Sequence, residues 1–167
     1  DLEVPGLPRR PGREVHRCTR LVEPRLAHQR PGLHQVARDL RGPVALARGK
    51  DDLIYVTEIA AGAVTEINVA SGARRVVADG LAGPEGIAVG PDGRLFVAEV
   101  GQKRVVAIDP ATGARTVIAS NLDIGLPPFQ GGPPGFIPTG VTVGANGVVY
   151  VSSDIRNALY RLTPPAP

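Results

Sequence analysis

One carboxylate in this sequence stands where it could do chemistry. Glu85 lies between Pro84 and Gly86, at the start of a short apolar run. A carboxylate in this position could bind a divalent metal, because hard cations such as Ca²⁺ bind oxygen. It could equally be a polar side chain that faces solvent from an ordinary strand. A Ca²⁺ ion takes roughly six to eight oxygens, so a metal site would need further donors around Glu85.

Two other carboxylates recur at a fixed spacing. Glu58 and Glu99 lie 41 positions apart, and each ends an apolar run. A carboxylate that recurs once per repeat more often caps a turn, by accepting backbone N–H bonds, than takes part in a reaction. We therefore predict a structural role for both.

Histidine and cysteine chemistry is nearly excluded from most of the chain. The single cysteine is Cys18, and none of the three histidines lies beyond His34. From residue 40 onward there is therefore no Ser–His or Cys–His pair and no histidine-based zinc site. A single cysteine also allows no intramolecular disulfide.

Composition and charge further narrow the fold class and the classes of partner that this protein could bind. Of the 167 residues 43% are hydrophobic but only 4% aromatic, and 21 Gly with 17 Pro predict many turns between short strands. The net charge of +3 comes from residues 1–39, where eight arginines face five acids, while residues 40–167 carry eleven charges of each sign. A neutral folded part argues against a nucleic-acid partner. No apolar run approaches the ~18 residues of a membrane span, and no signal-peptide pattern opens the sequence.

An internal repeat positions the carboxylates. Residues 40–80 and 81–121 align without a gap and share 16 identities, and a third copy, 137–162, follows 54 positions after the second. Each unit holds short apolar runs separated by turn sequences such as GPDG and PATG. The runs are nearly all apolar, which predicts sheets covered on both faces. Four antiparallel strands per ~40 residues, stacked face to face, indicate blades of an all-β propeller.

The repeat sets the expected organisation. Residues 1–32 are expected to form an irregular or disordered Arg/Pro-rich tail, or to be a segment read in a shifted frame. The propeller repeats occupy residues 33–162. Pro-rich residues 163–167 form a second tail, because proline cannot supply a further ladder strand. Within the repeats we expect an outer strand at 33–39, blades at 40–80 and 81–121, an insertion at 122–136 and a partial blade at 137–162. The fold expected is an incomplete β-propeller of about three blades.

The repeats resemble a known group of proteins. LAGPEGIAVGPDGRLFVAE and IPTGVTVGANGVVYVSSD are similar to repeats of the senescence-marker-protein/gluconolactonase-like and NHL-repeat propellers. The resemblance covers about residues 33–162 and implies a fragment of a larger, six-bladed TolB-like ring. In the gluconolactonase-like hydrolases, the residue between Pro and Gly on some blades binds a divalent cation such as calcium in the central channel. By position only Glu85 matches, since Val44 is no ligand and Thr139 is a poor one.

The resemblance carries several functional expectations. It implies a small molecule, with or without a divalent metal, bound at the central channel. An enzyme of this kind would be a metal-dependent lactonase-type hydrolase, expected to be inactive with this set of blades. The alternatives are a non-catalytic interaction module and a half-propeller that dimerises into a six-bladed ring. The partner would be a small molecule or a protein, with self-association through open blade edges. Related propellers are often exported.

The insertion contains two of the three phenylalanines. Phe129 and Phe136 lie in LPPFQGGPPGF, on the connection that leads to the face of Glu85. Such insertions often shape a ligand face. The alternative is a proline-stiffened loop whose aromatic rings pack over a blade edge.

Overall fold

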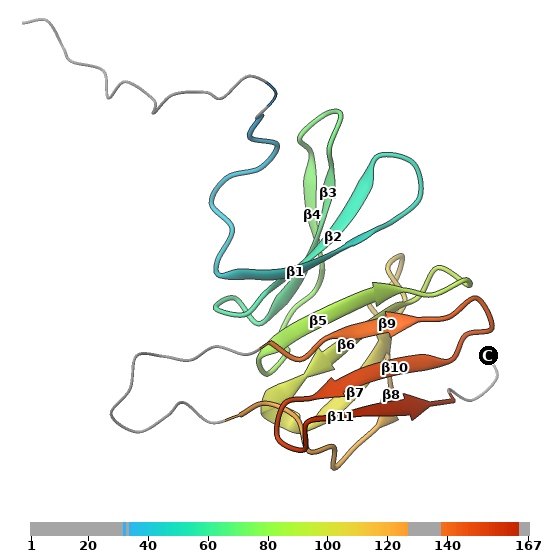
Figure 1. The fold of residues 1–167 in the computed structure, drawn as a ribbon. Coiled ribbons are helices and arrows are strands. Elements are labelled where there is room, and N and C mark those ends of the chain that lie inside the picture. The colour runs from blue at the N-terminus through green and yellow to red at the C-terminus, as the bar shows by residue number, and fades with distance from the viewer. Residues whose placement is uncertain (1–31, 33, 127–137, 164–167) are drawn as a thin grey trace, which may run out of the picture. The chain divides into compact units, whose positions relative to one another are not determined.

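A computed structural model describes residues 32, 34–126 and 138–163, and this part of the chain is all-β (Figure 1). It forms three antiparallel sheets, each with its strands in chain order. Sheet 1 contains β1 (Pro43–Arg48), β2 (Leu53–Glu58), β3 (Ala63–Asn68) and β4 (Arg74–Ala78). Sheet 2 contains β5 (Pro84–Val89), β6 (Leu95–Glu99), β7 (Arg104–Ile108) and β8 (Arg115–Ala119), with a short 3₁₀ turn η1 (Val100–Gln102). Sheet 3 contains β9 (Val141–Val143), β10 (Val149–Ser153) and β11 (Ala158–Leu162). The all-β fold class is confirmed.

The first two sheets repeat each other in detail. The register between first and second strands shifts between Pro43 and Leu46 in sheet 1, and at the equivalent residues Pro84 and Ile87 in sheet 2. The third and fourth strands shift once more at matching positions in the two sheets. A bulge at the start of each first strand changes the direction of the side chains that begin it.

Turn residues with positive φ also recur. Gly72 and Gly113, between the third and fourth strands, both have φ of 73°. Between the second and third strands the recurring left-handed position is held by Gly62, Lys103 and Asn157, with φ of 61°, 53° and 51°. Asparagine and glycine adopt this conformation readily, whereas lysine does so at a cost. The cost suggests that the side chain of Lys103 is needed at its position.

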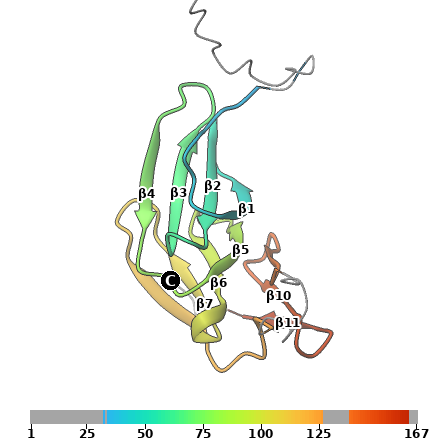
Figure 2. The same cartoon turned by 90° about the vertical axis from the view of Figure 1, so that its left-hand side faces the viewer.

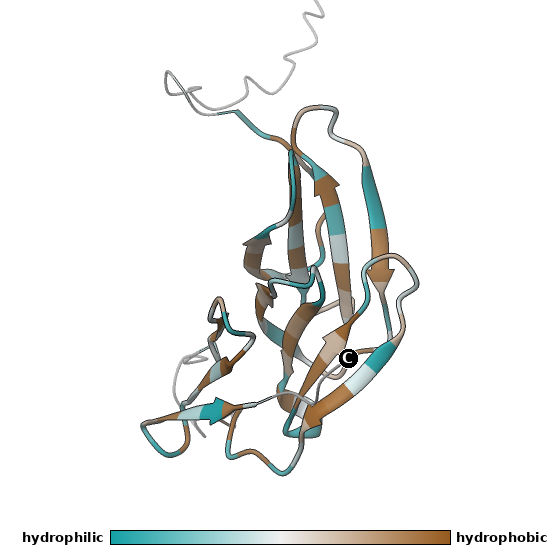
Figure 3. Ribbon diagram, turned by 90° about the vertical axis from the view of Figure 1, so that its right-hand side faces the viewer, coloured by the Kyte–Doolittle hydropathy of each residue, from teal (hydrophilic) through white to brown (hydrophobic). Residues whose placement is uncertain are grey.

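Two hydrophobic cores lie between neighbouring sheets. The first, between sheets 1 and 2, contains Ala47, Tyr55, Val64, Val77, Ala78, Leu81, Ile87, Leu95, Val97, Val106 and Ile108. The second, between sheets 2 and 3, contains Phe96, Val105, Ala107, Ile124, Val149 and Val151. Alternate residues of β6 face the two cores, which explains why residues 95–98 of this strand are all apolar. Figure 2 shows the strands of sheet 1 side by side, and Figure 3 shows hydrophobic stretches along most strands.

Residues 34–40 form no strand, although the repeat predicts an outer strand at 33–39. A strand needs a neighbour to pair with, and the described residues place no other strand beside this segment. The segment is nevertheless attached to sheet 1, because the Arg74 guanidinium donates a hydrogen bond of 2.5 Å to the Arg38 carbonyl oxygen. Within the described residues, no helix has the length and apolar character needed to cross a membrane.

Candidate functional site

Glu85 lies where the first strands of all three sheets meet. Its main-chain carbonyl oxygen accepts a hydrogen bond of 2.7 Å from the Thr57 hydroxyl of sheet 1. Its carboxylate oxygen Oε2 accepts one of 2.6 Å from the Thr139 main-chain N–H, just before β9. The residue is 4% exposed, so it is buried rather than solvated. Glu85 therefore links β5 to the sheets on both sides.

The close approach of β5 and β9 requires a glycine beside Glu85. A Cβ atom built on Gly86 would lie 2.4 Å from the Thr139 carbonyl oxygen and 2.7 Å from the Val141 nitrogen. Both are main-chain atoms and cannot rotate away. Glycine is therefore required at position 86 if β5 and β9 are to lie this close together.

The environment of Glu85 favours its protonated form. Burial raises the pKa of the carboxyl above its ordinary value of 4.5. The Thr139 amide and hydroxyl lower this pKa, the negative charge of Asp154 raises it and the positive charge of Lys103 lowers it, with a net upward shift. Asp154 and Lys103 therefore both influence the Glu85 carboxyl, and the sequence pattern singled out neither of them.

Asp154 and Lys103 hold the chain that follows sheet 2. The carboxylate of Asp154 accepts hydrogen bonds from the main-chain N–H groups of Gly125, at 2.9 Å, and Leu126, at 2.6 Å. The Lys103 ammonium donates to the carbonyl oxygens of Ile124 and of Gly125, the latter at 2.8 Å. The signal for both was a departure from the repeat: Asp154 aligns with Val100, and Lys103 with a glycine.

Glu58 and Glu99 have the structural role predicted for them. Glu58 accepts a hydrogen bond of 2.5 Å from the main-chain N–H of Arg41, and Glu99 accepts one of 2.8 Å from that of Ala82. Arg41 and Ala82 are equivalent in the repeat. Glu99 also accepts a bond of 2.6 Å from the Arg104 guanidinium. Each carboxylate ties the segment before a first strand to the end of the second strand.

Two polar atoms at the start of the inner strands form no hydrogen bond with the described residues. The Thr139 hydroxyl is buried and completes no hydrogen bond with the described residues, although it lies close enough to Glu85 to lower the pKa of the carboxyl. For the second oxygen of Glu85, Oε1, the described residues provide no donor that forms a hydrogen bond. A buried polar group without a partner costs about 1–3 kcal/mol, so water or a ligand is expected there.

The donors around Glu85 do not make a metal site by themselves. Among residues 34–126 and 138–163, no three His, Cys, Asp or Glu side chains are grouped so that they could hold a metal ion. One oxygen of Glu85 is already engaged by Thr139. The metal-ligand role of Glu85 stays a prediction. Phe129 and Phe136 lie outside the described residues.

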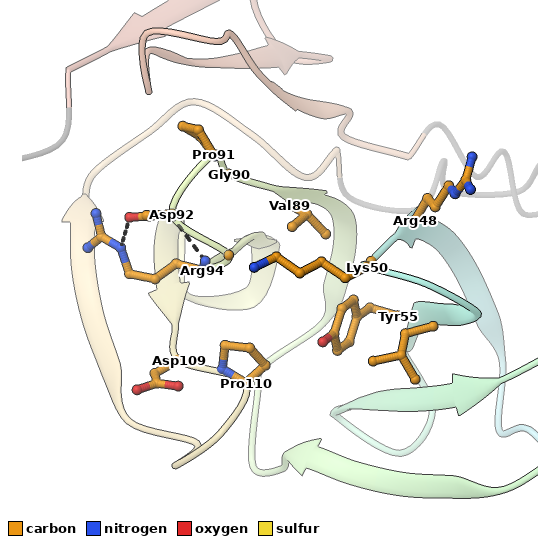
Figure 4. Close-up of a pocket in the computed structure, with 13 residues that line it drawn as sticks. Arg48, Lys50, Tyr55, Val89, Gly90, Pro91, Asp92, Arg94, Asp109 and Pro110 are labelled. Carbon is orange, nitrogen blue, oxygen red and sulfur yellow. Dashed lines mark hydrogen bonds and ion pairs between the residues drawn. The ribbon is translucent and has the colours of Figure 1, made fainter.

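A separate groove lies between sheets 1 and 2, at the other end of the inner strands. It has a volume of about 510 Å³ and is lined mainly by the turns that follow β1, β5 and β7 (Figure 4). The side chain of Lys50 extends into it between Val89 and Tyr55, whose hydroxyl has a pKa raised by burial and by Glu66. Of the candidate site residues named from the sequence, none that the structure describes lines this groove.

Comparison with solved structures identifies the architecture. A gluconolactonase from Xanthomonas campestris, XC5397, superposes with a TM-score of 0.58 and 16% identity, over 77% of this chain and 46% of its own. The PQQ-bound form of an aldose sugar dehydrogenase from Streptomyces coelicolor gives 0.59 and 19%, over 81% of this chain and 49% of its own. The WD40 β-propeller domain of Doa1 gives 0.53 and 18%, over 72% of this chain and 36% of its own.

The three sheets are propeller blades. The sheets do not close into a ring, and the chain spans less than half the length of these solved structures. At such low identity the likeness establishes the fold alone. A sequence model of the strictosidine synthase-like N-terminal family matches residues 71–100, which include the start of blade 2 and Glu85. No curated protein matches the chain by sequence.

Proposed function

We propose that this protein binds a small hydroxylated molecule, of the sugar or sugar-lactone class, where the inner strands of its blades begin. The proposal rests on the Thr139 hydroxyl, a buried polar group to which the described residues give no partner, beside a carboxyl with one oxygen that accepts no hydrogen bond from them. Binding pockets characteristically offer a few convergent polar groups in otherwise apolar surroundings. A ligand hydroxyl would donate to Oε1 of Glu85 and accept from Thr139.

The class of ligand is inferred from the hydrogen-bonding groups of Glu85 and Thr139 and from two of the similar solved structures. A carboxyl and a hydroxyl together suit a partner that both donates and accepts hydrogen bonds, as sugar hydroxyls do. Two of the similar structures are a gluconolactonase and an aldose sugar dehydrogenase. The raised pKa of Glu85 keeps part of the population protonated in weak acid, so the group can also donate.

The proposed binding does not require a metal ion. The described donors supply one free carboxylate oxygen at Glu85, far short of the roughly six to eight oxygens of a Ca²⁺ shell. The binding of a hydroxylated molecule needs only the hydrogen-bonding groups that the inner strands already present. Added Ca²⁺ is nevertheless a direct probe of the predicted metal role of Glu85.

Calorimetric titration tests the proposal. We expect saturable binding of D-glucono-1,5-lactone or a related sugar by the unaltered protein, and a loss of more than about tenfold in affinity in Thr139→Val and Glu85→Gln. The matched control is Asp52→Asn, which removes an exposed carboxylate from the turn after β1. If no sugar binds the unaltered protein, or if sugars bind Thr139→Val as tightly as the unaltered protein, the proposal is contradicted. Either result would favour a non-catalytic interaction module. A rise in melting temperature with Ca²⁺ that Glu85→Gln removes would assign the metal role instead.

A further inference from the structure

Blade 3 has one uncovered face. Leu159 on β11 is 67% exposed, whereas its equivalents Val64 in blade 1 and Val105 in blade 2 are 0% exposed. Tyr150 on β10 is half-buried, whereas its equivalent Phe96 is 2% exposed. In blades 1 and 2 this face packs against the next blade. Among the described residues, therefore, no blade packs against this face of blade 3.

Blade 3 also lacks an outer strand among the described residues. Its third strand, β11, pairs only with β10, whereas the third strands of blades 1 and 2 each pair with a fourth. The free side of β11 consequently offers unpaired backbone groups, which makes it a template for another strand.

Blade 1 exposes part of the opposite face. Leu46 on β1 is 67% exposed, whereas its equivalent in blade 2, Ile87, is 6% exposed because blade 1 covers it. The side of blade 1 that corresponds to the covered side of blade 2 is therefore incompletely packed near the inner strand. The exposed face of blade 3 and the exposed face of blade 1 are therefore of the two kinds that pack against each other between blades 1 and 2.

Residues 35–38 lie on blade 1 as an outer strand lies on the following blade. The Arg74 guanidinium donates to the Arg38 carbonyl oxygen, and at the equivalent positions Arg115 donates to the Asp79 carbonyl oxygen. Asp79 directly follows β4, so the second contact fixes the outer strand of blade 1 on blade 2. The segment 35–38 thus has the place of an outer strand whose three inner strands are not supplied by the described residues.

We propose that a second copy of this chain supplies those three strands. Among the described residues, blade 3 has three strands without an outer one, and residues 35–38 occupy the place of an outer strand without the other three. Docking β9–β11 of the second copy against blade 1 would place β11 beside residues 35–38 and cover both Leu46 and Leu159. Two-fold symmetry repeats the contact and closes the assembly. Two sets of three blades make six, within the usual four to eight of a propeller.

The repeat fixes the register of the new strand pair. β3 pairs with β4 at Val64 and Ala78, and β7 with β8 at Val105 and Ala119. By the same spacing, Leu159 of one copy would pair with Ala37 of the other.

Sedimentation velocity tests the association. We expect a dimer at micromolar concentration, and a dissociation constant raised more than about tenfold by Leu159→Asp and by Leu46→Asp, because each would place a charge in an apolar interface. The matched control is Val117→Asp, which alters an exposed valine in the middle blade and should leave the dimer intact. A monomer at micromolar concentration would overturn the proposal. Equal weakening of the dimer by all three substitutions would also overturn it.

Cysteine cross-linking tests the register without depending on affinity. With Cys18 replaced by Ser, a mixture of Ala37→Cys and Leu159→Cys proteins should form a covalent heterodimer under mild oxidation. The control mixture pairs Ala37→Cys with Thr112→Cys, in the turn between β7 and β8, and should form none. Equal cross-linking in both mixtures, or none in the first, would refute the paired strands.

Discussion

A single methyl group at Gly86 should disturb the contact between blades 2 and 3. The added Cβ would lie 2.4 Å from the Thr139 carbonyl oxygen and 2.7 Å from the Val141 nitrogen, so β9 would have to move. Overpacking of this kind costs about 1–3 kcal/mol. Replacing glycine by alanine returns about 0.4–1 kcal/mol through the unfolded chain. Because both clashing atoms belong to the backbone, we take the upper end of the range and expect Gly86→Ala to lower the free energy of unfolding by about 2 kcal/mol.

Gly140→Ala is the matched control. Gly140 follows Pro138 and Thr139 as Gly86 follows Pro84 and Glu85, but its nearest neighbour would be the Ser152 hydroxyl oxygen at 3.3 Å. This atom belongs to a side chain, which can adjust. We expect a change within about 0.5 kcal/mol.

Urea denaturation of the two variants at one fixed protein concentration measures the difference. The midpoint should fall for Gly86→Ala with an unchanged m-value, and the melting temperature should fall by roughly 5–8 °C. Equal losses in the two variants would show that the interblade contact does not carry the effect. A neutral Gly86→Ala would show that β5 and β9 lie further apart than described.

Three further outcomes follow from the packing and the charges. Phe96→Ala should cost about 3–5 kcal/mol in urea denaturation, because the ring is buried between blades 2 and 3, whereas Val117→Ala on the exposed outer strand should cost less than about 0.5 kcal/mol. Glu99→Ala should cost about 2–3 kcal/mol, since it leaves both the Ala82 N–H and the Arg104 guanidinium without their partner, while Glu99→Gln should cost less because its amide oxygen still accepts from Ala82. The pKa of Glu85 is raised in the folded protein, so its protonated form stabilises the fold below pH 4.5 and this contribution is lost as the pH rises through the folded pKa. The melting temperature of the unaltered protein, relative to that of Glu85→Gln, should therefore fall between pH 4 and pH 7, and a constant difference would contradict the raised pKa.

The pairing of the strands was largely predictable because it depends on local pattern. Apolar runs 41 residues apart, with glycines such as Gly72 and Gly113 at the same turn, fold into sheets of the same register. The roles of Glu58 and Glu99 followed from the same period, since equivalent carboxylates meet equivalent backbone donors. Residues 34–40 were the exception: their sequence has the pattern of a strand, but a strand forms only beside another.

What the sequence determined by itself, then, was the repeating unit, the all-β class and the absence of histidine and cysteine chemistry from residue 40 onward. Only the tertiary structure decided what surrounds each unit. Leu46 and Ile87 are equivalent in the repeat, yet one is exposed and the other buried, because a blade covers only the second. The contact of Glu85 with Thr139, 54 positions along the chain, likewise depends on how closely two blades approach. Packing between units depends on which neighbour is present, and the pattern within a unit does not contain that information.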